Sequence, residues 1–196
     1  ENRSGWDDAY AEWTDVYGND IFLGLNAVKY KLNCSAEELV ALAKENGVTL
    51  ETQRHVWEQN VKMVNYRFWQ NLADCERDLH TVSAHRAIAD GKVAYSRGEI
   101  SDAEDKDGNL QPSHAEVRFV DGLNEMYEVL KDYPTLAQHD AYIDEILLAA
   151  HYWKTIRQYN DKEPSADFSL LPFVMRHASR QPDIEQTFMR ENRSSF

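Results

Sequence analysis

The sequence predicts an all-α fold of antiparallel helical hairpins. Only 8 of the 196 residues are glycine and 5 are proline, so few positions favour turns. Apolar residues recur every three or four positions along most of the chain, which is the period of an amphipathic helix. Capping residues stand where several of these segments begin or end, which is independent support. We expect about six or seven helices in an array or bundle, followed by an irregular C-terminal strap.

The first 48 residues are predicted to form short N-terminal helices. Aromatic residues at spacings of four, three and four indicate a first helix that packs into the core and ends at Gly18. These residues are Trp6, Tyr10, Trp13 and Tyr17. A second helix is expected over about 20–32. Ser35 and Glu38 form a capping-box pattern that begins a third helix, and Gly47 is placed to end it in the left-handed conformation.

The segment 50–79 predicts one long, unbroken helix of about 45 Å. Its apolar residues recur at spacings of three and four and form one buried stripe. They are Trp57, Val61, Val64, Phe68, Leu72, Cys75 and Leu79. A turn near His80 and Thr81 then leads to a helix over about 82–97, which Gly98 ends.

The second half of the chain predicts an acidic loop over 101–113 and two further long helices. A helix over 114–131 is closed by Pro134, and its expected inward residues are Val117, Val120, Leu123, Met126, Val129 and Leu130. A helix over 140–159 buries Ile143, Ile146, Leu147, Ala150, Trp153 and Ile156.

From Asn160 the helical pattern fails, so an extended strap is expected to pack across the helices. Prolines punctuate this tail, and its apolar residues are Phe168, Leu170, Leu171 and Phe173. We therefore interpret 1–196 as a single helical domain. It comprises N-terminal helices (1–48), a core (50–159) and an irregular tail (160–196).

The charge balance disfavours nucleic acid and anionic membranes as partners. Lysine and arginine number 21 against 34 acidic residues, which gives a net charge of −13, and no basic patch is evident. The longest aliphatic stretch, Ile146–Ala150, is too short to span a bilayer, so we expect no transmembrane segment in this chain.

The acidic loop resembles part of a calcium-binding loop, because Gly108 follows alternating acids. The pattern fails at its first and twelfth positions, which hold Ala103 and His114. We therefore favour a solvated acidic turn over a cation site at 102–109, and keep calcium binding as an alternative.

No motif for a catalytic nucleophile, a phosphate-binding loop or a metal site occurs in the sequence. The seven histidines form no pair at metal-ligand spacing on one helix face; they are His55, His80, His85, His114, His139, His151 and His177. We assign no catalytic, cofactor-binding or metal-binding residue and no cofactor. An enzyme that assembles acid and base groups from distant helices stays open as a third possibility.

Two cysteines do not make a disulfide framework. Cys75 lies on an apolar helical stripe and is predicted to be a buried thiol, while Cys34 is predicted to be the more exposed, and their pairing stays open. The aromatic cluster 65–69 could stack a base or bind a peptide, but its helical spacing favours a core role.

Small and aromatic residues follow one another at spacings of four, three and five along 91–103: Gly91, Tyr95, Gly98 and Ala103. This order resembles the first helix and turn of a tetratricopeptide (TPR) repeat, and Ala115, Phe119, Gly122, Leu123 and Pro134 resemble its second helix. The resemblance implies that Gly91 lets the paired helix approach, that Tyr95 fills the gap and that Gly98 turns the chain. Gly91 and Pro134 are 43 residues apart, against about 24 in a regular repeat, so we expect one TPR-like right-handed pair and no regular solenoid.

The chain also resembles an uncharacterised protein family from planctomycete bacteria. The residues that carry this resemblance lie at 51–54, 57–58, 60–66, 69, 91–103, 122–123, 133–134 and 167–170. The resemblance implies an N-terminal membrane anchor ahead of this region, in keeping with a sequence that begins at Glu1. It implies no activity and no site residue.

The sequence favours a protein-protein interaction or scaffold module, because stacked helical hairpins bury their apolar stripes against each other and leave an extended groove. If the acidic loop is used for binding, it should select a basic protein partner; the alternative, which we favour slightly, is that its acids only keep the domain soluble. A ligand- or calcium-binding helical domain is the alternative, and an enzyme of unrecognised class is the third hypothesis.

Overall fold

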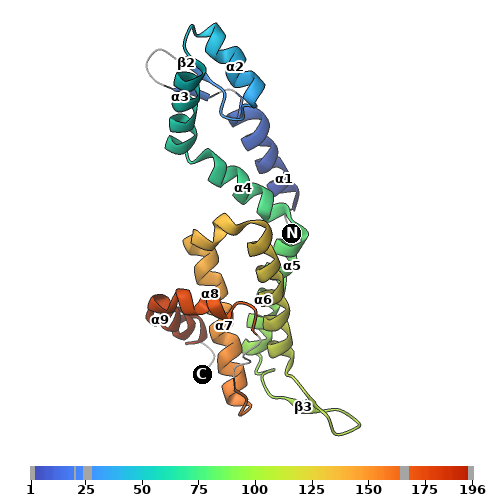
Figure 1. The fold of residues 1–196 in the computed structure, drawn as a ribbon. Coiled ribbons are helices and arrows are strands. Elements are labelled where there is room, and N and C mark those ends of the chain that lie inside the picture. Colours follow the sequence, from blue (N-terminus) through green and yellow to red (C-terminus); the bar gives the residue numbers. More distant parts are fainter. Residues whose placement is uncertain (1–2, 20, 24–27, 164–167, 194–196) are drawn as a thin grey trace. The chain divides into compact units, whose positions relative to one another are not determined.

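The computed structural model describes residues 3–19, 21–23, 28–163 and 168–193 (Figure 1). Its contacts divide the chain into two compact units, Glu1–Asp78 (unit 1) and Leu79–Phe196 (unit 2). This boundary falls inside the predicted 50–159 core. Helices dominate both units, which confirms the all-α prediction. Within the described residues, no helix combines the length and apolar character needed to cross a membrane.

Unit 1 begins with the predicted aromatic helix. Helix α1 spans Arg3–Ala11 and continues as a π-helical turn over Glu12–Tyr17. Trp6 and Tyr17 are 39% and 41% exposed, so the aromatic stripe is only partly core. The helix ends at Gly18, where only glycine fits, because a Cβ there would lie 2.4 Å from the Thr14 carbonyl oxygen and 2.6 Å from the Tyr66 hydroxyl.

The predicted helix over 20–32 is wrong. Strand β1 (Ile21–Leu23) instead pairs with strand β2 (Val28–Tyr30) in an antiparallel hairpin, with Ile21 opposite Tyr30 and Leu23 opposite Val28. Both strands are rich in β-branched and aromatic residues, which favour a pleated conformation. Leu25, which belongs to the predicted helix, lies outside the described residues.

Helix α2 (Ala36–Glu45) has the predicted ends. The Ser35 side chain accepts a hydrogen bond from the Glu38 backbone, the Glu38 side chain accepts one from the Ser35 backbone, and Gly47 has a φ of +67°. Both capping predictions are therefore confirmed.

The predicted unbroken helix over 50–79 is wrong, because the chain breaks twice. Helix α3 (Leu50–Met63) ends before Asn65, which has a left-handed φ of 52°. Helix α4 (Tyr66–Arg77) follows, and Asp78 is extended. The first break places Tyr66 in a core cluster with Leu32 and Val61. Asparagine tolerates the left-handed conformation, so an apolar stripe alone does not reveal such a turn.

Unit 2 is built on three long helices joined by short connections. They are α5 (Leu79–Ser96), α6 (His114–Asp132) and α7 (Asp140–Tyr159), and a 3₁₀ turn over Pro134–Gln138 links the last two. The predicted helices over 82–97, 114–131 and 140–159 are confirmed, although α5 begins directly after Asp78 without the turn expected at His80. All six residues predicted to be buried on α7 are buried.

Small residues let α5 and α6 approach closely. A Cβ on Gly91 would lie 3.2 Å from the Phe119 ring, and one on Gly122 would lie 2.7 Å from Ile88. The approach predicted at Gly91 is therefore present. Tyr95 instead contacts the rings of Tyr152 on α7 and Phe188, at 4.9 and 5.8 Å.

The predicted inward face of α6 is partly wrong. Val117 and Val120 are 37% and 36% exposed. The buried face runs through Ala115, Glu116, Phe119, Gly122, Leu123, Met126 and Val129. Alanine and glycine on this face weaken its apolar signal, although they allow the close packing with α5.

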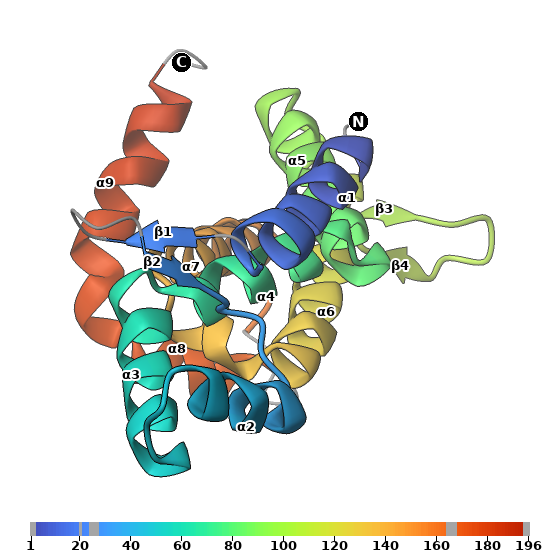
Figure 2. The ribbon, with the colours of Figure 1, turned by 90° about the horizontal axis from the view of Figure 1, so that it is seen from above.

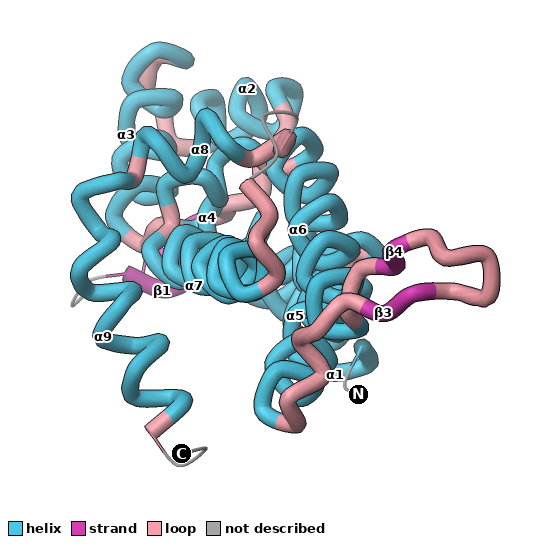
Figure 3. The backbone as a smooth tube through the Cα atoms, turned by 90° about the horizontal axis from the view of Figure 1, so that it is seen from below, coloured by secondary structure: helices cyan, strands magenta, loops and turns pink. Residues whose placement is uncertain are grey.

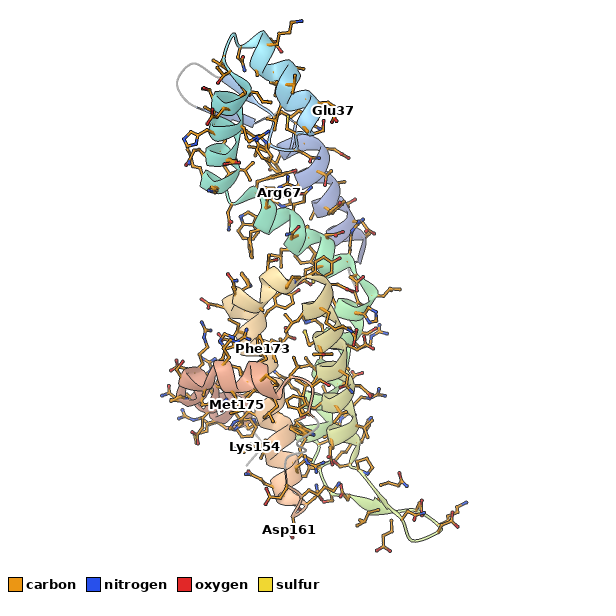
Figure 4. All side chains as sticks on the ribbon, viewed as in Figure 1. Glu37, Arg67, Lys154, Asp161, Phe173 and Met175 are labelled. Carbon is orange, nitrogen blue, oxygen red and sulfur yellow. The ribbon has the colours of Figure 1, made fainter. Side chains whose placement is uncertain are left out.

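The C-terminal segment is helical, so the predicted irregular tail is wrong. Helix α8 spans Leu171–Arg176 and helix α9 spans Gln181–Asn192, with a 3₁₀ turn over Ala178–Arg180 between them. Pro172 and Pro182 lie in the first turns of these helices, where the missing N–H group is not needed. Figure 4 labels two residues of α8, Phe173 at 8% exposure and Met175 at 68%, so α8 also has a packed side.

Candidate functional site

A β-hairpin projects from the helices of unit 2 between α5 and α6 (Figure 3). Strand β3 (Ala103–Glu104) pairs with strand β4 (Leu110–Gln111), with Glu104 opposite Leu110. All four residues are exposed. The predicted acidic loop is therefore an ordered hairpin.

Asp105 organises the tip of this hairpin. Its carboxylate accepts hydrogen bonds from the backbone N–H groups of Asn109 and Asp107, each at 2.9 Å, and from the Gln111 amide at 3.0 Å. These bonds, above all the one from the Asn109 backbone, hold the pKa of the Asp105 carboxyl below its ordinary value. Gly108, with a φ of +80°, completes the turn.

Asp102 anchors the base of the hairpin. Its side chain is 7% exposed, lies 2.5 Å from the ammonium group of Lys162, and accepts a hydrogen bond from the Ser113 backbone at 3.2 Å. Burial acts to lower the pKa of Lys162, but its hydrogen bonds to Asp102 and Glu116 outweigh burial and raise that pKa. The lysine is therefore held in its charged form.

Glu116, on α6, is the centre of this anchor. Its side chain is 4% exposed and accepts hydrogen bonds from Arg157 at 2.8 Å and Lys162 at 3.1 Å. Arg157 also donates two hydrogen bonds to the Glu163 carbonyl. A buried carboxylate is tolerated when it is paired and hydrogen-bonded, as here. The network of Asp102, Glu116, Arg157 and Lys162, called the anchor network below, ties the hairpin to α6 and to the end of α7.

The uncharged side chain of Asn160 forms two further hydrogen bonds beside the anchor network. Its side-chain oxygen accepts a hydrogen bond from the Asp102 backbone at 3.0 Å, and its side-chain nitrogen donates to the Ile100 carbonyl at 2.7 Å. Both bonds hold the segment that leads from α5 into β3.

We did not predict the anchor network from the sequence. Ser113 and Glu116 do have the Ser-x-x-Glu spacing of a helix start, and the Ser113 hydroxyl accepts from the Glu116 backbone at 3.2 Å. That pattern could have located the start of α6. It could not have shown that the Glu116 side chain turns toward Arg157.

Three hairpin side chains near the tip remain exposed and form no ion pair or hydrogen bond with other described residues. They are Glu104, Lys106 and Asp107. Leu110 is 68% exposed beside them. The hairpin therefore presents an acidic surface with one apolar side chain.

The carboxylates of the predicted cation loop have different partners. Asp102 is bound to Lys162, and Asp105 is bound to the turn. Within the part of the chain that the structure describes, no group of three histidine, cysteine or acidic side chains is placed to hold a metal ion.

Three histidines pair with carboxylates from other parts of unit 2. The pairs are His80–Glu125 at 2.6 Å, His85–Glu145 at 2.8 Å and His114–Glu99 at 2.6 Å. Each pair joins two segments of the helical framework, so these histidines have packing partners and do not converge on one point.

The aromatic cluster 65–69 is divided between core and surface. Tyr66 is fully buried, while Trp69 is 41% exposed and stacks on Trp13 at 6.1 Å. Cys75 is buried and Cys34 is half-buried, as predicted, and neither forms a disulfide. Burial raises the pKa of the Cys34 thiol.

A second surface feature of unit 2 is a cleft of about 610 Å³ between α5, α7 and α9. Charged side chains line most of it. Figure 2 shows α9 and the hairpin on opposite sides of the unit 2 helices, as does Figure 3. The two features are therefore separate surfaces.

No family model, curated protein or solved structure matches the chain. The functional proposal accordingly depends on the geometry of the chain itself.

Proposed function

We propose that this chain is a protein-interaction module that docks a basic protein partner through the β3–β4 hairpin. The observation that supports this most is the contrast between the hairpin's ends and its surface. Asp105 orders the tip and the anchor network holds the base, while Glu104, Asp107 and Leu110 point outward without partners among the described residues. A preordered projecting element loses little conformational entropy when a partner binds.

The charge of the hairpin selects the class of partner. Glu104 and Asp107 outnumber Lys106 among the exposed charges near the tip, and the chain as a whole has a net charge of −13. Such a surface attracts basic partners and repels acidic ones, and the attraction is screened within about 8 Å at physiological ionic strength. Leu110 supplies an apolar contact at the same place.

Two predictions from the sequence stay predictions: that α5 and α6 form a TPR-like pair, and that the chain is related to the planctomycete family. The close approach of α5 and α6 at Gly91 and Gly122 supports a tightly packed helical pair as the platform for the hairpin. If the α5–α6 pair stays rigid while the hairpin binds its protein partner, the chain can act as a scaffold.

The structure shows which acidic residues of the hairpin can be replaced to test this proposal. Replacing all the acids of the loop would disturb the fold, because Asp102 and Asp105 are structural. The informative variant is Glu104→Gln with Asp107→Asn. The matched control is Glu58→Gln with Asp90→Asn, which removes the same charge from exposed helical positions.

The experiment uses the full chain as bait in native extract, followed by association kinetics with the captured protein. We expect the hairpin variant to capture several-fold less of a basic protein than the control variant does. Its association rate should also lose most of its dependence on salt, since steering depends on exposed charge. Equal capture and equal rates for the two variants would show that the hairpin is only a solvated connection.

A further inference from the structure

The floor of the cleft between α5, α7 and α9 is apolar, whereas its walls are charged. Leu148 and Ile184 are 6% and 3% exposed and form the floor. A volume of about 610 Å³ lies within the range of ligand-binding sites in proteins. The cleft therefore has room for a ligand of a few residues.

Most charges in the walls already have partners within unit 2. Lys92 lies 3.1 Å from Glu191, Arg180 lies 2.6 Å from Asp144, and Glu145 is paired with His85. These pairs leave few groups free to bind an incoming molecule.

Two opposite charges in the cleft form no ion pair with other described residues. Asp183 and Arg190 are both exposed on α9, with Thr187 between them. Positions 183, 187 and 190 share one face of a helix. Seven residues of helix place Asp183 and Arg190 about 10 Å apart along the axis.

This spacing fits an extended peptide. In the polyproline II conformation, residues i and i+3 lie on the same side and about 9 Å apart. Acidic and basic side chains at i and i+3 would therefore meet Arg190 and Asp183 together.

We infer that the cleft binds a peptide segment in the polyproline II conformation that carries one acidic and one basic side chain three residues apart. The acidic side chain pairs with Arg190, the basic side chain pairs with Asp183, and the intervening residues cover Leu148 and Ile184. This site goes beyond the proposed hairpin function, because it uses none of the hairpin residues.

The test is a titration of the full chain with the capped peptide acetyl-Glu-Pro-Pro-Lys-amide, followed by the amide NMR signals of Leu148 and Thr187. We expect saturable shifts with a dissociation constant of about 1 mM. Arg190→Ala and Asp183→Asn should each weaken binding about threefold, the effect of one exposed ion pair. The matched controls Arg176→Ala and Glu185→Gln, which lie outside the cleft, should leave it unchanged.

Charge reversal gives a second readout. Arg190→Glu should weaken acetyl-Glu-Pro-Pro-Lys-amide and should strengthen acetyl-Lys-Pro-Pro-Lys-amide. Non-saturating shifts up to about 10 mM, equal losses in the control variants, or equal binding of acetyl-Gln-Pro-Pro-Gln-amide would overturn the inference. Hairpin variants should not affect this titration, so the two proposals can fail separately.

Discussion

One buried polar side chain in each unit is held in a different way. In unit 2 the Glu116 side chain is 4% exposed, and its two carboxylate oxygens are bound by Arg157 and Lys162. In unit 1 Tyr66 is 0% exposed, and its hydroxyl has no hydrogen-bond partner within the described residues. Charge fixes the first side chain and shape fixes the second, because the Tyr66 hydroxyl lies 2.6 Å from where a Cβ on residue 18 would be. Unit 2 should therefore be sensitive to loss of charge, and unit 1 to changes in volume.

The largest expected effect is in unit 2. Glu116→Ala leaves Arg157 without its carboxylate partner and Lys162 with Asp102 alone, and should lower the free energy of unfolding by about 3–5 kcal/mol. Urea unfolding followed by far-UV circular dichroism measures this. Glu128→Gln, which breaks an exposed pair with Lys131, should cost less than about 1 kcal/mol. Similar losses for the two variants would contradict the importance of the anchor network.

A change of volume should be costly in unit 1. Gly18→Ala places a methyl group 2.4 Å from the Thr14 carbonyl oxygen and should destabilise unit 1 by about 1–3 kcal/mol. Gly47→Ala is the matched control, because its Cβ meets no atom within 4 Å and only its φ of +67° opposes alanine. Its cost should be about 1 kcal/mol. If Gly18→Ala costs no more than the control, close packing does not hold this end of the helix.

The hydroxyl groups of two buried tyrosines give the sharpest comparison of the units. The Tyr152 hydroxyl accepts a hydrogen bond from Asn192 at 2.9 Å and donates one to Glu191 at 3.0 Å. Tyr152→Phe should therefore cost about 1–2 kcal/mol, while Tyr66→Phe should change the stability by less than about 0.5 kcal/mol. Denaturant unfolding of both variants measures the difference. A loss above about 1 kcal/mol for Tyr66→Phe would reveal a partner for its hydroxyl.

The smallest expected effect is a pH dependence in unit 2. Burial lowers the pKa of His151, which packs against Phe188 with ring centroids 4.7 Å apart. The unfolded chain therefore binds a proton more readily than the folded one. Above a pH of about 6.5, His151 is neutral in both the folded and the unfolded chain, so it does not lower the free energy of unfolding. Below that pH the unfolded chain takes up a proton first, and the free energy of unfolding falls as the pH drops toward the pKa of His151 in the folded chain.

His151→Gln should remove this part of the acid sensitivity, a difference of about 1 kcal/mol or less between pH 7 and pH 5. Comparison with the parent chain cancels the contributions of the other histidines. An unchanged pH profile would mean that His151 is as easily protonated in the folded chain as in the unfolded one.

The parts of the fold that we predicted correctly depend on near neighbours in the sequence. The Ser35–Glu38 capping box, the left-handed Gly47 and the helix over 140–159 are set by residues at most four positions apart. The prolines at 172 and 182 misled us, because a proline ends one helix but also suits the first turn of another. The break at Asn65 escaped us because an apolar stripe continues through it.

By itself the sequence determined an acidic chain, its helical class, the ends of α2, α6 and α7 and the acidic connection between α5 and α6. The tertiary structure alone decided how that connection is held and which of its acids are free. Glu116 meets Arg157 and Lys162 at sequence separations of 41 and 46, and Asn160 meets Ile100 at 60. No local pattern encodes such pairs, because their geometry arises only when packed helices bring distant residues together. The same packing decided that Asp183 and Arg190 share one cleft with α5 and α7.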